Sequence, residues 1–102
     1  MLPNKIVQLV RDLRVKTESG LISWTYDDES AAVASDVAEL NINVTVSYRF
    51  DTIEEVGTFR IDIYDKGSNQ ELIFKTTQMY NDFDLVRALY DSAQASGYDF
   101  SF

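Results

Sequence analysis

The chain of 102 residues contains no cysteine and no histidine. Without cysteine it forms no disulfide bond and offers no thiol nucleophile, and without histidine it has no imidazole base and no His-containing catalytic triad. Zinc sites built on Cys and His are excluded for the same reason. Since cysteine-free chains suit a reducing compartment, we expect a cytoplasmic protein.

The sequence also lacks any run of about 20 apolar residues, the length that a membrane-spanning helix needs. Its first segment, MLPNKIVQLVRDLRVK, interrupts an apolar pattern with charges at Lys5, Arg11 and Arg14. Such a segment is unlike a secretory signal peptide. We therefore expect no membrane association.

Motifs for common enzyme chemistries are missing, because the chain has no P-loop, no GxGxxG and no GxSxG. Carboxylates are plentiful, so a carboxylate-based enzyme or a divalent-cation binder stays open as an alternative. The acidic run 27–29 is one candidate, and 65–71 is another, although the latter lacks the ligand spacing of a calcium loop. We interpret both as solvated turns and expect no enzyme activity, catalytic residue, cofactor or metal.

Proline and glycine are scarce, with one and four residues, while 45% of the chain is hydrophobic and 13% aromatic. This composition predicts one ordered domain over residues 1–102. The net charge of −8 repels phosphate backbones, so nucleic acid is not an expected partner. An acidic mimic of nucleic acid, inhibiting a DNA- or RNA-binding protein, is an alternative, although the carboxylates are scattered along the chain.

Two segments have helical periodicity, one at each end of the chain. Residues 4–18 place Ile6, Val10 and Leu13 on one stripe, with Gly20 as a plausible stop. Residues 82–96 carry a wide apolar stripe and begin where Asn81 or Asp82 can cap a helix. Both stripes require an apolar surface to cover.

Between these segments the pattern changes to strict alternation. Residues 40–50, LNINVTVSYRF, alternate apolar and polar side chains, and 58–64 repeat the pattern with Arg60, Asp62 and Tyr64 on the polar face. Shorter strands are expected at 21–27, where Trp24 would seal the core, and in QELIFKTT. We expect 28–34 to be a loop and 36–40 to lead into the long strand.

The order helix, strands, helix predicts an α+β fold. A meander of four to five antiparallel strands has one apolar face, and both helices need that face. The expected architecture is a two-layer sandwich with the N- and C-terminal helices packed on one side of the sheet and a polar face open on the other.

A short series of residues carries a resemblance. The first expected helix closes on Thr17 and Gly20, Trp24 follows four residues later, and the last helix has the spacing Leu-Tyr-x-x-Ala over 89–93. This order resembles a group of small bacterial α+β proteins of uncharacterised function, whose shared pattern is a leucine-rich helix ending Thr-x-x-Gly-x-x-x-Trp, a sheet, and a helix with Leu-Tyr-x-x-Ala. The Ala-rich segment 29–38 departs from that pattern. The resemblance implies a fold and carries over no catalytic residue.

The last five residues, YDFSF, place Tyr98, Phe100 and Phe102 on alternate positions of an aromatic tail, 98–102. Three interpretations compete for this tail. It covers its own core or sheet edge, it pairs with an edge or groove of a second copy, or it docks into another protein.

The outward residues Arg49, Arg60 and Tyr64 form a second candidate surface on the open sheet face. We expect Asp62 to pair there with an arginine of a neighbouring strand, which favours charge pairing over nucleic-acid binding. The overall hypothesis is a small non-enzymatic interaction or accessory domain that self-associates as a homodimer, binds an unidentified protein partner, or both.

Overall fold

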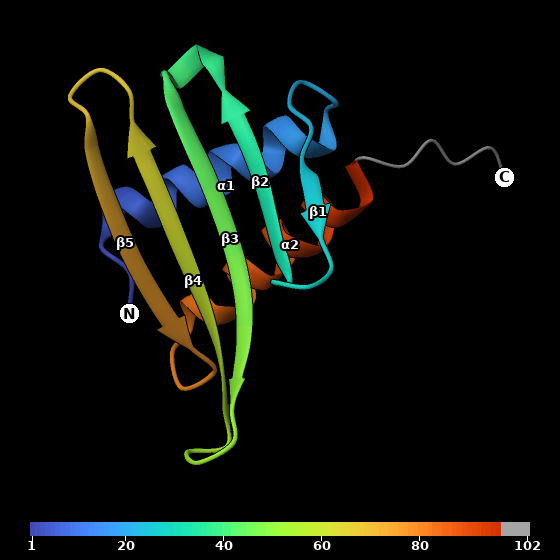
Figure 1. Ribbon diagram of the computed structural model, residues 1–102, viewed down its shortest axis with the longest axis vertical. Helices are drawn as coiled ribbons and strands as arrows, with labels where there is room; N and C mark the ends of the chain where they lie inside the picture. Colours follow the sequence, from blue (N-terminus) through green and yellow to red (C-terminus); the bar gives the residue numbers. More distant parts are fainter. Residues whose placement is uncertain (97–102) are drawn as a thin grey trace, which may run out of the picture.

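The computed structural model describes residues 1–96, which form two helices and a five-stranded antiparallel sheet (Figure 1). The strands follow chain order across the sheet, so every connection is a hairpin or a short turn. This confirms the predicted α+β fold. The elements are α1 (Asn4–Glu18), β1 (Thr25–Asp27), β2 (Ala32–Val37), the 3-10 turn η1 (Ala38–Leu40), β3 (Ile42–Asp51), β4 (Val56–Asp65), β5 (Gln70–Thr77) and α2 (Asp82–Ser96).

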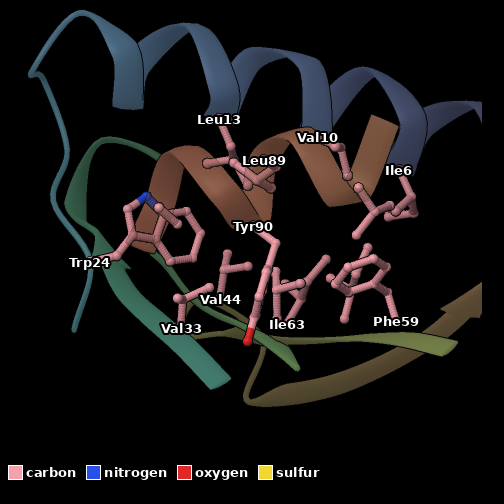
Figure 2. Close-up of a cluster of buried hydrophobic side chains, with 14 of the residues drawn as sticks. Ile6, Val10, Leu13, Trp24, Val33, Val44, Phe59, Ile63, Leu89 and Tyr90 are labelled. Atoms are coloured by element: carbon pink, nitrogen blue, oxygen red, sulfur yellow. The ribbon is translucent and has the colours of Figure 1, made fainter. Parts of the chain in front are cut away.

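Both helices cross one face of the sheet, and the core lies between the two layers (Figures 1 and 2). The register places Val44 opposite Ile63 and Val46 opposite Ile61, so the alternating apolar residues of β3 and β4 meet on this face. Ile6, Val10 and Leu13 of α1 point toward it in Figure 2. The buried apolar residues are Leu2, Ile6, Val10, Leu13, Trp24, Val33, Val37, Ile42, Val44, Val46, Phe59, Ile61, Ile63, Phe83, Val86, Leu89, Tyr90 and Ala93.

Trp24 connects the two helices to the start of β1. Its indole Nε1–H donates to Thr17 Oγ1 at 2.9 Å, and the Thr17 hydroxyl donates in turn to the Leu13 carbonyl at 2.6 Å. The Trp24 backbone N–H donates to Ser96 Oγ of α2 at 3.0 Å. Trp24 is buried, as predicted, and Thr17 satisfies the polar end of its ring.

Gly20 ends α1, as its position after the apolar stripe predicts. Its φ of +77° lies in the left-handed region that glycine adopts without strain. The Gly20 N–H donates to the Thr17 carbonyl and the Leu21 N–H to the Lys16 carbonyl, at 3.1 and 2.9 Å. These two bonds are the Schellman motif that closes many helices.

Asp82, the first residue of α2, ties three segments together. Its carboxylate accepts the Leu2 backbone N–H at 2.6 Å and the Thr76 hydroxyl of β5. Leu2 and Thr76 are both buried. The expected start of the helix is confirmed, but the Asp82 carboxylate bonds to Leu2 and Thr76 and not to a backbone N–H of the helix. It fixes the N-terminal segment against the last strand.

The expectation for residues 28–40 was wrong in two respects. Residues 32–37, part of the expected loop and lead-in, form β2, in which Val33 and Val37 are fully buried. The chain then makes the turn η1, and the left-handed Asn41 (φ 56°) delays the start of β3 to Ile42. Alanine favours helix locally, but the alternation of Val33, Ser35 and Val37 against β3 decides the outcome.

The strand expected at 21–27 is shorter than predicted. β1 comprises only Thr25–Asp27, because the preceding residues complete the end of α1. Leu21 is consequently exposed.

We predict that Thr17→Val lowers the free energy of unfolding by about 1–3 kcal/mol, because the nearly isosteric change leaves the buried indole N–H without an acceptor. Chemical denaturation followed by far-UV circular dichroism measures the loss, because Trp24 is the only tryptophan and the double variant below lacks it. Thr25→Val, at an exposed position, is the matched control and should leave stability nearly unchanged. Adding Trp24→Phe to Thr17→Val should cost less than the sum of the two changes, and strict additivity would contradict the coupling.

Candidate interaction surface on the open sheet face

The face of the sheet opposite the helices is uncovered within residues 1–96 (Figure 1). Its side chains divide into two zones. The zone on β1, β2 and the first half of β3 is built of small residues, including Ala32, Ala34 and Thr45. The zone on β4, β5 and the end of β3 carries long charged side chains.

Three cations come together in the second zone, and we call Arg49, Arg60 and Lys75 the basic cluster. Arg60 of β4 lies directly opposite Lys75 of β5, and Arg49 lies opposite Thr58 in the adjacent row. Like charges opposite one another destabilise a strand pair. In a chain with a net charge of −8, the cluster is a local reversal of sign.

Only one member of the basic cluster has a carboxylate partner among residues 1–96. Arg60 Nε lies 2.8 Å from Asp62 Oδ1, whereas Arg49 and Lys75 take part in none of the ion pairs of this part of the chain. The expectation that Asp62 would pair across strands was therefore wrong. Two residues apart on β4, Arg60 and Asp62 share one face, and the arginine bends along its own strand.

The basic cluster lines a concavity of about 920 Å³, which we call the basic concavity. Hydroxyl groups of Ser47, Thr58 and Thr77 contribute to its lining. Residues 29–31, in the turn between β1 and β2, form another part of its wall. The lining also includes Glu29 and Asp51, and the Asp51 carboxylate accepts the N–H groups of Ile53 and Glu54 in its own turn. The three cations and the hydroxyl donors form the part of the site that is suited to a carboxylate ligand.

Apolar residues of the β3–β4 hairpin complete the lining. Phe50 and Ile53 are 50% and 92% exposed, and Tyr48 is 36% exposed. The alternation had placed Tyr48 and Phe50 on the buried face, and that expectation of burial was wrong. The hairpin continues past the helices, as Figure 1 shows, so its end has no layer to cover it. Tyr48 still packs on Phe59, with ring centroids 5.1 Å apart.

The predicted surface residues are only partly brought together. Arg49 and Arg60 share the basic concavity, but Tyr64 lies two rows further along β4, where its hydroxyl donates to Asn69 Oδ1 at 2.6 Å. Tyr98, Phe100 and Phe102 lie outside the described residues. The sequence reasoning missed Lys75, which pairing of QELIFKTT with the preceding strand would have placed opposite Arg60.

The two acidic candidates occupy turns. Asp27 Oδ1 accepts the Glu29 N–H at 3.1 Å, and Asp65 Oδ1 accepts the Gly67 N–H at 3.0 Å. Over residues 1–96, no three acidic side chains gather in a way that could hold a metal ion. In the same part of the chain, neither helix has the length and apolarity needed to cross a bilayer.

Tyr90 of α2 supports one wall of the basic concavity from inside the protein. Its hydroxyl donates to the Ala31 carbonyl at 2.8 Å, which holds the turn between β1 and β2. Ala31 has a φ of 50°, so this bond stabilises a left-handed residue. Burial, followed by the neighbouring Tyr26 hydroxyl, raises the pKa of Tyr90 to about 12.

Comparison with family models, with curated proteins and with solved structures finds no match.

We predict that Tyr90 makes the protein sensitive to alkali. Because its pKa rises from 10.0 to about 12 on folding, the neutral phenol contributes stability below pH 10 that is lost between pH 10 and pH 12. Unfolding free energy measured across this range should fall more steeply for the native chain than for Tyr90→Phe. Tyr80→Phe, at an exposed position, is the control and should retain the native slope. Equal slopes for all three proteins would contradict this role.

Proposed function

We propose that this protein is a small non-enzymatic interaction domain that self-associates and holds an acidic protein segment in the basic concavity. The proposal rests on one observation: Arg60 lies directly opposite Lys75 on the uncovered face of the sheet. A like-charge pair costs stability in the free domain, and a bound carboxylate offsets this cost. Arg49, which has no ion-pair partner in residues 1–96, is available to the same ligand.

An acidic peptide fits this site better than nucleic acid does. Arginine guanidinium groups bind carboxylates through two parallel hydrogen bonds, and the exposed Ile53 in the turn of the β3–β4 hairpin adds apolar contact for side chains between the acidic residues. The net charge of −8 repels any anionic ligand, but it opposes a phosphate backbone, with one charge per nucleotide, more than a short segment that carries only a few carboxylates. The proposed ligand is therefore a short segment that mixes carboxylates with apolar residues.

The charge pattern of the sheet face disfavours the alternative of an acidic nucleic-acid mimic. Asp62 and Glu71 lie among Arg60 and Lys75 on this face, so its charges alternate in sign instead of forming a continuous negative array. The carboxylates in the turns 27–29 and 65–67 accept backbone N–H groups, which is a structural role. No observation favours a carboxylate-based enzyme over the interaction domain.

A fluorescein-labelled peptide of alternating glutamate and leucine tests the proposed site by fluorescence anisotropy. We predict that Arg49→Gln with Arg60→Gln weakens binding by roughly tenfold, since each exposed ionic contact contributes about 0.2–1 kcal/mol. The matched control is Lys5→Gln with Arg87→Gln. It removes the same charge from the helices and likewise combines one ion-paired and one unpaired cation of the described residues.

Binding should also weaken as salt rises, because the contacts are partly exposed. Equal losses in the two double variants would mean that net charge alone attracts the peptide, and would contradict the site. If a single-stranded oligonucleotide bound more tightly than the peptide, with the same dependence on Arg49 and Arg60, the ligand of this site would be a nucleic acid and the proposed acidic peptide would be wrong.

A further inference from the structure

β5 is an edge strand with a long free side. It is the last of the five strands in the sheet, it pairs with β4 over eight residues, and no other strand of residues 1–96 lies beyond it (Figure 1). The opposite edge, β1, has only three residues. An exposed edge presents unpaired backbone N–H and C=O groups that can pair with another strand.

The register determines which backbone groups face the free side. Gln78 N–H donates to the Gly57 carbonyl at 3.2 Å, and Thr76, Phe74 and Leu72 follow at two-residue steps opposite β4. In antiparallel strands, alternate residues direct both backbone groups to the same neighbour. The residues in between, Glu71, Ile73 and Lys75, therefore direct theirs to the free edge.

Of the usual protections of an edge, β5 has charged side chains, at Glu71 and Lys75, but neither a proline nor a bulge. Its sequence, QELIFKTT, contains no proline, and its pairing with β4 runs without a bulge from Gln70 to Thr77. Leu72 and Ile73 are 40% and 48% exposed, on opposite faces of the strand. Natural proteins usually cover or interrupt an edge of this length and apolarity.

The same strand is complementary to itself about Ile73. In an antiparallel pair of two β5 strands centred on Ile73, Glu71 of each copy lies opposite Lys75 of the other, on the open face of the sheet. On the helix-covered face, Leu72 of each copy lies opposite Phe74 of the other. Opposite charges and apolar side chains at facing positions both stabilise a strand pair.

The charges in the single chain support this arrangement. Neither Glu71 nor Lys75 takes part in an ion pair within residues 1–96. Lys75 has Arg60 opposite it on the β4 side, so a carboxylate on its free side would relieve the repulsion. The only carboxylate that this pairing brings there is Glu71 of a second copy.

We propose that two copies pair antiparallel along β5, centred on Ile73, and form a symmetric dimer with one continuous ten-stranded sheet. This inference rests on the proposed self-association and names its interface. The two open faces lie on the same side of the dimer, because a two-fold axis through the Ile73 pair runs perpendicular to the sheet. Lys75 is then neutralised by the second copy, and Arg49 and Arg60 remain for the acidic ligand.

The test exchanges the two charges. Glu71→Lys and Lys75→Glu each turn both facing pairs into like-charge pairs, and we expect either variant to raise the dimer dissociation constant by about tenfold to hundredfold. The double variant restores opposite charges and should dimerise like the native chain. Mixing the two single variants should produce a heterodimer, because one chain is then basic at both positions and the other acidic at both.

Light scattering and sedimentation give the molecular mass of each variant, and measuring it over a wide range of protein concentration gives the dimer dissociation constant. Both side chains are exposed, so the variants should keep the native fold, which circular dichroism checks. Glu54→Lys and Lys5→Glu make the same changes in net charge at other exposed positions and should leave the dimer unchanged.

Backbone amide exchange gives an independent measure of the interface. The Ile73 and Lys75 amides should exchange more slowly as concentration rises, while the Phe74 amide, directed to β4, stays protected at every concentration. The β5 interface would be overturned if the chain dimerises but the charge variants dimerise equally well and the Ile73 amide exchanges at the same rate at every concentration. Self-association itself would then still hold. A chain that is monomeric at every concentration would overturn both, and peptide binding would still judge the basic concavity separately.

Discussion

The one-sided apolar face of the sheet is the constraint on which the rest of the structure depends. Alternation along β3 and β4 puts valine and isoleucine on one side only, and burying each such side chain contributes about 1.5–3 kcal/mol. Both helices must therefore lie on that side. Trp24 then closes one end of the two-layer core through Thr17 and Ser96, while Asp82 closes the other through Leu2 and Thr76.

The same constraint leaves particular surfaces uncovered. The helices cross the strands, so two of them side by side cover about 20–24 Å of strand length, whereas the ten residues of β3 extend about 33 Å. The end of the β3–β4 hairpin consequently projects beyond the core, and Phe50 is exposed although its position in the alternation is apolar. The open sheet face is uncovered because both helices lie on the other side, and the edge of β5 is free because no other strand of residues 1–96 pairs with it.

Local patterns in the sequence were sufficient to predict the layers and the meander, but not every strand or its register. Period-two alternation predicted β3 and β4, and the stripe ending at Gly20 predicted α1, because each depends only on neighbouring residues. β2 was missed because its alternation is short and set in an Ala-rich segment, so pairing with β3 overrides helix propensity. Lys75 was missed because its proximity to Arg60 is a property of register, which depends on how β5 meets β4.

The charges of β4 and β5 differ from what folding alone would favour. A sheet face selected only for stability would place opposite charges at facing positions, yet Arg60 faces Lys75 and Glu71 faces Tyr64. If the glutamate stood four residues later, at position 75, it would lie opposite Arg60 and neutralise it within the chain. The dimer that we propose would supply this displacement, because antiparallel pairing about Ile73 brings residue 71 of one strand beside residue 75 of the other. In that proposed dimer, the mismatch within one chain would become complementarity between two chains, and this link between the charge pattern and assembly is the physical basis of the proposal.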